Sequence, residues 1–166
     1  EIADCYNSGS IVGTTADYES DAGGIVGYHN KSSVQNCYNI GSVEGYHNVA
    51  QIAAYRYNTP TVANCYYLSD TETEDGGRTA EQFASGEMTW ILNGESYNGA
   101  WKQTLGENAY PVFEGDTVYY GNLCATGEAI GYTNEKAYNT EEHYSEDGYC
   151  EICGLQPASL AEDGYY

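Results

Sequence analysis

A sequence repeated along the first part of the chain most constrains how it can fold. Residues 4–13 return as residues 36–45, and a shorter third copy follows at residues 64–68. The shared cysteine, at positions 5, 37 and 65, recurs after 32 and then 28 residues. Residues 23–28 likewise align with residues 50–55. Units of this length bury their apolar residues by stacking on their neighbours.

Each copy has the pattern of short β-strands separated by turns. Asn-Ser-Gly, Gly-Gly and His-Asn sequences interrupt the apolar runs too often for helices of about ten residues. Stacked copies would place equivalent residues about 4.8 Å apart in ladders. We therefore predict a mainly β chain in which residues 1–68 form a short β-solenoid. Cys5, Cys37 and Cys65 are expected to form a buried file, with the tyrosine after each pointing the opposite way.

The composition changes after residue 68. Residues 69–77 are acidic and rich in turn formers, so we expect an exposed loop. Thr79 and Gln82 have the spacing of a capping box and predict a helix that begins at residue 80. A second short helix is predicted over residues 87–92, broken from the first at Ser85-Gly86 and ended by Asn93-Gly94.

These features predict three units. After residues 1–68, residues 69–120 form a small α/β segment, with strands near Trp101, residues 110–113 and residues 118–120. We expect this segment to cap the open end of the solenoid and so protect its strand edges. Residues 121–166 are the third unit, a small Cys/His module and linker. Because it has few large aliphatic residues, it needs a disulfide or a metal ion to stabilise it.

The sharpest cluster of chemistry-bearing residues lies in this third unit. Cys124, His143, Cys150 and Cys153 are separated by 18, six and two residues, and Cys150-x-x-Cys153-Gly154 has the form of a zinc knuckle. A closed Cys3His site would hold a structural zinc. The alternatives are a disulfide from Cys124 to Cys150 or Cys153, and a redox pair within the Cys-x-x-Cys motif.

Composition excludes some classes of partner. Five Lys and Arg against 25 Asp and Glu give a formal charge of −20, which disfavours nucleic acid and anionic membrane surfaces. No apolar run is long enough to cross a bilayer, and the first residues do not resemble a signal peptide. We therefore interpret the chain as an internal piece of a longer protein with flanking domains. Residues 72–75 are a weak candidate for calcium, because their carboxylates lack a defined spacing.

The repeat also carries a resemblance. Residues 36–43 together with Gly23-Gly24-Ile25-Val26-Gly27 resemble GLUG-motif repeats, although the second copy has Gln51 and Ala54 in place of two glycines. The resemblance extends over residues 4–113 and implies a secreted or cell-surface bacterial protein. Such repeats occur in adhesin-like proteins and in non-catalytic parts of IgA-cleaving metalloproteases. Residues 148–158 are similar to small cysteine modules of surface proteins from gut anaerobes.

Sequence patterns of catalysis are otherwise missing. We find no metalloprotease, nucleophile-elbow or phosphate-loop motif, and His29 and His47 lie in turn sequences where the side chain is usually solvated. We therefore expect the chain not to be an enzyme. A structural or adhesive repeat segment is the leading hypothesis.

The alternative hypothesis is a carbohydrate- or protein-binding accessory module of a secreted glycosidase or protease, with a glycan or a host surface protein as partner. Trp101 and Trp90 are the candidates for stacking on such a ligand, together with Tyr119 and Tyr120. In a chain with only two Phe, however, large aromatic residues are needed first to fill the core.

Overall fold

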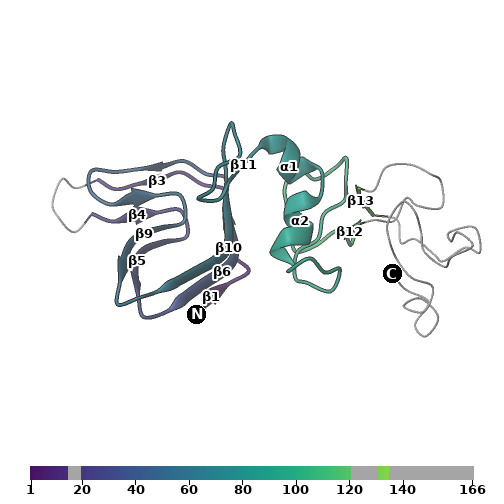
Figure 1. The fold of residues 1–166 in the computed structure, drawn as a ribbon. Coiled ribbons are helices and arrows are strands. Elements are labelled where there is room, and N and C mark those ends of the chain that lie inside the picture. The colour runs from purple at the N-terminus through teal and green to yellow at the C-terminus, as the bar shows by residue number, and fades with distance from the viewer. Residues whose placement is uncertain (15–19, 121–130, 135–166) are drawn as a thin grey trace, which may run out of the picture.

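The structure, a computed structural model, describes residues 1–14, 20–120 and 131–134 and is mainly β (Figure 1). The strands of residues 1–68 follow the copies of the repeat. Copy one contains β1 (Ile2–Ala3), β2 (Tyr6–Asn7), β3 (Ile11–Val12), β4 (Ala22–Gly23) and β5 (Val26–Asn30). Copy two contains β6 (Ser33–Asn39), β7 (Val43–Glu44), β8 (Val49–Ala50) and β9 (Ala53–Tyr57), and copy three consists of β10 (Thr61–Leu68).

Every strand of copy one pairs in parallel with its equivalent in copy two. β1 and β2 pair with β6, β3 with β7, β4 with β8 and β5 with β9, while β10 pairs with the other side of β6. Cys65 lies opposite Cys37, and Tyr28 lies opposite Tyr55. The predicted alignment of the copies is therefore confirmed at the level of individual residues. The copies are stacked in register, so strands far apart in the sequence lie side by side (Figure 1).

Asparagine side chains fix this register at the corners of the copies. Asn36 and Asn64 both have a left-handed backbone, with φ of 53° and 52°, where asparagine is better tolerated than other non-glycine residues. Their side chains are also hydrogen-bonded to each other, so asparagine both adopts the backbone of the corner and links neighbouring copies. Ladder bonds join Asn7 to Asn39 at 2.8 Å, Asn30 to Asn58 at 3.0 Å and Asn36 to Asn64 at 2.8 Å.

Alternation along the strands separates two apolar clusters. The interior of the stack contains Val34, Cys37, Ile52 and Ala53, all buried. The neighbouring Tyr38 points out of the opposite face and is also buried. The predicted opposition of cysteine and tyrosine is thus confirmed, because successive strand residues face opposite sides.

The helical segment packs on the tyrosine face of the stack. α1 (Ala80–Ala84) begins at the predicted capping box, and α2 (Glu87–Leu92) follows Gly86 at φ 94°. Phe83, Met88, Leu92 and Trp101 form one buried cluster with Tyr38. The helices themselves do not cap the open end of the stack as predicted, because their apolar residues contact the flat face across the copies.

Short pairings complete the described chain. β11 (Gly77–Arg78) pairs in parallel with the end of β10 and covers only that part of its outer edge. β12 (Tyr119–Tyr120) pairs antiparallel with β13 (Tyr132–Thr133), and the nearby Asn134 side chain donates to the Thr117 carbonyl at 3.0 Å. Residues 131–134, which belong to the predicted third unit, therefore pack on the second.

Candidate functional site

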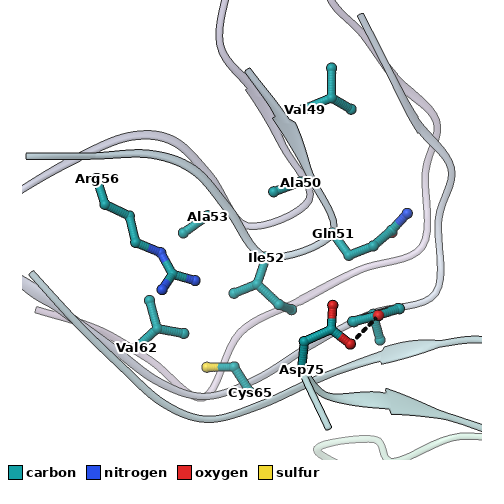
Figure 2. A pocket seen from close by; sticks show the side chains of 10 residues that line it. Val49, Ala50, Gln51, Ile52, Ala53, Arg56, Val62, Cys65 and Asp75 are labelled. Carbon is teal, nitrogen blue, oxygen red and sulfur yellow. Dashed lines mark hydrogen bonds between the residues drawn. The ribbon is translucent and has the colours of Figure 1, made fainter. Parts of the chain in front are cut away.

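The interior of the stack opens to solvent beside copies two and three. No described strand pairs with β8 or β9 on the side away from copy one. The resulting hollow has a volume of about 350 Å³ (Figure 2). Its floor is apolar and its rim is charged, a combination that suits a small ligand. The floor is formed by Ile52, Ala53, Val62 and Cys65, and the rim includes Gln51, Arg56, Tyr67 and Asp75.

Arg56 and Asp75 carry opposite charges into this hollow. Arg56 lies opposite His29 in the strand register, on the same side of the sheet as the interior residues. Asp75 accepts hydrogen bonds from the hydroxyls of Thr73 at 2.6 Å and Tyr67 at 2.8 Å. These bonds hold the pKa of Asp75 below its ordinary value, so its carboxylate stays ionised. The hollow can therefore accept a ligand with both a donor and an acceptor.

Cys65 is the one nucleophilic side chain among the residues that line this hollow. Interaction with the neighbouring Cys37 side chain is the main cause that lowers the pKa of Cys65, and the Arg56 charge makes a smaller contribution in the same direction. Burial opposes both effects. Cys37 itself is fully buried, and its pKa is raised by the neighbouring Cys65 side chain and by burial.

A second surface feature lies on the outer face of β5 and β9. The rings of Tyr28 and Tyr55 stack with centroids 5.4 Å apart and an interplanar angle of 16°. Tyr28 is 54% exposed and Tyr55 38%. Tyr57, also exposed, lies two residues farther along the same face. Together these three tyrosines, which we call the tyrosine platform, present flat aromatic surface to solvent.

The two tryptophans occupy different positions from those expected of ligand-stacking residues. Trp101 is fully buried, its ring stacks on Phe113 at 4.6 Å, and its Nε1 donates to the Asn36 carbonyl at 3.2 Å. It therefore belongs to the core, and the expectation that it stacks on a ligand does not hold. Trp90 is half-buried against Tyr120, with centroids 6.0 Å apart.

His29 also differs from expectation. It is 1% exposed rather than solvated, because its position in β5 points into the stack, and neither ring nitrogen has a hydrogen-bond partner among the described residues. The sequence misled us because His29 precedes a turn but lies within the strand.

The predicted metal ligands Cys124, His143, Cys150 and Cys153 lie outside the described residues. Within the described part of the chain, no three His, Cys, Asp or Glu side chains gather as a metal site. In the predicted calcium loop, Glu72 lies 3.9 Å from Arg78, and Asp75 bonds the two hydroxyls named above. No described helix has the length and apolarity that crossing a bilayer requires.

Sequence reasoning missed the hollow and the tyrosine platform. The signal for the platform was present, since Tyr28 and Tyr55 occupy the same position of the aligned copies. The hollow depends on where the stack ends and on the position that the loop before β11 gives to Asp75. Local sequence patterns predict neither feature.

Comparison with known protein families identifies a motif within the repeat. Residues 18–44 match the GLUG motif, and the match spans β4 to β7. This confirms the GLUG resemblance for that segment. No curated protein and no solved structure matches the chain.

Proposed function

We propose that the chain is a non-catalytic structural and adhesive segment of a secreted bacterial cell-surface protein, with residues 1–68 as a β-solenoid. The parallel, residue-by-residue pairing of successive copies is the observation that carries the proposal. A stack of this kind extends its side faces with each copy and gives a binding surface without needing a catalytic pocket. The charge of −20 suits a solvated surface.

Location and adhesion are tested separately. Antibodies against the chain should label intact cells of the encoding bacterium as strongly as permeabilised cells, and labelling only after permeabilisation would contradict surface location.

For adhesion, beads coated with the chain should be retained under flow on a mucin-coated surface. Beads coated with Gly41→Ala, which disturbs the register of the copies, are the matched control. Equal retention of both beads, or of neither, would contradict an adhesive role of the stack.

A second candidate function, a carbohydrate-binding accessory module, rests on the tyrosine platform. Flat exposed rings match the apolar faces of sugar rings, and the large negative charge favours neutral over acidic glycans. Tyr55→Ala should weaken binding of a neutral polysaccharide at least tenfold, which is about 1.4 kcal/mol. Tyr55→Phe should retain binding, and Tyr46→Ala, which removes an exposed tyrosine away from the platform, should not affect it. Binding that is unchanged in Tyr55→Ala excludes the platform as the site.

We also propose that Cys124, His143, Cys150 and Cys153 form a structural site for one zinc ion. The support is their spacing in the sequence. A disulfide from Cys124 to Cys150 or Cys153 is the competing interpretation.

A further inference from the structure

The cysteines of the three copies lie in one file. The register places Cys65 opposite Cys37, and the Tyr38 amide donates to the Cys5 carbonyl at 3.1 Å, which keeps Cys5 in the same row. All three are free thiols. Paired residues of neighbouring strands are about 4.8 Å apart. That spacing falls within the range of about 4.4 to 6.8 Å between the Cα atoms of a disulfide.

The thiols also point the same way. Each donates to the carbonyl two residues before it, at 3.0 Å for Cys5, 3.0 Å for Cys37 and 3.2 Å for Cys65. A left-handed residue precedes each cysteine. Of the three, Cys37 is buried, Cys65 is half-buried and Cys5 is exposed, so the expectation that the whole file is buried is wrong. The side chains of Cys37 and Cys65 are therefore neighbours on the same side of paired strands.

Accessibility separates the two members of this pair. Cys65 lines the hollow beside Arg56, where a small reagent can reach it (Figure 2). Cys37 is 0% exposed and lies one copy deeper in the stack. A reagent entering the hollow thus meets Cys65 first, while Cys37 is placed to attack whatever forms on Cys65.

We propose that Cys65 and Cys37 are an attacking and a resolving thiol that form a disulfide between copies two and three by exchange with a small-molecule disulfide. The Cys65 thiolate, beside the Arg56 guanidinium, attacks one sulfur of the reagent and releases one thiol. Cys37 then loses its proton and attacks the Cys65 sulfur, which releases the second thiol. Two protein thiols are oxidised and one reagent disulfide is reduced to two thiols. The product ties β10 to β6 and does not depend on the proposed adhesive function.

Peptide mapping tests the linkage directly. Trypsin cleaves after Lys31, Arg56 and Arg78, so peptides 1–31, 32–56 and 57–78 carry one of these cysteines each. The folded full chain is treated with bis(2-hydroxyethyl) disulfide, which is neutral, then alkylated and digested without reduction. We expect peptide 32–56 linked to peptide 57–78. Linkage of peptide 32–56 to peptide 1–31, linkage of Cys65 to a cysteine of residues 121–166, or no linkage at all would overturn the proposal.

Variants test the order of attack. Cys37→Ala should accumulate the mercaptoethanol adduct on Cys65, whereas Cys65→Ala should leave Cys37 unmodified while the protein stays folded by circular dichroism. Cys5→Ser is the control and should still form the 37–65 linkage. Adduct on Cys37 in folded Cys65→Ala would overturn the assigned roles.

The role of Arg56 has its own readout. In the Cys37→Ala background, Cys65 is the sole cysteine of residues 32–78, so its adduct is followed by mass alone. Arg56→Gln should slow adduct formation measurably, because loss of the positive charge raises the pKa of Cys65 and lowers its thiolate fraction, while the higher nucleophilicity partly compensates. Arg56→Lys should retain the rate. An unchanged rate in Arg56→Gln would overturn the assigned activation of Cys65.

Discussion

Asn64 donates its side-chain amide to the side-chain oxygen of Asn36, its equivalent in the preceding copy, at 2.8 Å. The same amide also donates to the Ile91 carbonyl at 2.9 Å and the Leu92 carbonyl at 3.3 Å, at the end of α2. One side chain thus links two copies of the repeat to the helical segment. Its left-handed backbone adds a second requirement at the same position.

Two substitutions separate these requirements. Asn64→Gly keeps the left-handed backbone accessible and removes the side-chain bonds, which should lower the free energy of unfolding by about 1 to 3 kcal/mol. Asn64→Ala should lower it by about 1 kcal/mol more, since alanine disfavours this backbone. Urea unfolding followed by circular dichroism measures both. Equal stability of Asn64→Ala and wild type would show that the corner is not held as described.

Gly9 and Gly41 form a matched pair at one position of the repeat. A Cβ at Gly41 would lie 1.9 Å from the Gly9 carbonyl oxygen, whereas a Cβ at Gly9 meets only Asn7 Oδ1 at 3.6 Å. Gly41→Ala should therefore destabilise the chain by about 3 kcal/mol, because backbone must move to make room. Gly9→Ala should change stability little in the same denaturation experiment. Similar losses in the two variants would contradict the close approach of the copies.

Substitution of Trp101 should lower the stability of the fold. Its ring contacts Tyr6, Tyr38 and Phe113 with centroids 6.2, 5.2 and 4.6 Å away. Trp101→Ala leaves a large cavity and should cost about 3 to 5 kcal/mol. Trp90→Ala, which removes a half-buried ring, is the control and should cost clearly less. Urea midpoints decide the comparison, and a larger loss in Trp90→Ala would reverse our assignment of the core.

Alkaline pH should destabilise the tyrosine cluster. Burial, with smaller contributions from Tyr6 and Tyr110, raises the pKa of Tyr38 above its ordinary value of about 10. The stabilisation from neutral Tyr38 is therefore complete below about pH 10 and declines as the pH rises toward the higher folded pKa. The free energy of unfolding should fall above pH 10.

Tyr38→Phe should weaken this pH dependence because it removes the ionising group. At neutral pH the variant should lose about 1 kcal/mol, since the Tyr38 hydroxyl donates to the Pro111 carbonyl. Tyr120→Phe, at a half-exposed tyrosine, is the control and should keep the wild-type slope. An unchanged slope in Tyr38→Phe would show that another group governs the alkaline transition.

Metal analysis tests the zinc proposal. Purified chain should contain one zinc per molecule, and His143→Ala should lower that content, because a closed site loses one of its four ligands. A free-thiol count under non-reducing conditions is made in parallel. No zinc together with two fewer free thiols among Cys124, Cys150 and Cys153 would favour the disulfide.

The sequence by itself determined the repeat, the alignment of its copies and the start of α1. Cys5, Cys37 and Cys65 recur at the same position, and stacking of equal units follows from the need to bury one face. Thr79 and Gln82 likewise define the helix start through bonds only three residues apart. These features are local or periodic, so they are visible along the chain.

Only the tertiary structure decided which faces are covered. Trp101 is buried because its ring and Nε1 meet Tyr38 and the Asn36 carbonyl, more than sixty residues away in sequence. The helices lie on the tyrosine face, which leaves the interior open beside Arg56 and Cys65. The identity of Trp101 or Cys65 in the sequence does not tell whether its side chain is buried or exposed. Their roles depend on which segments, distant in sequence, pack against them in the folded chain.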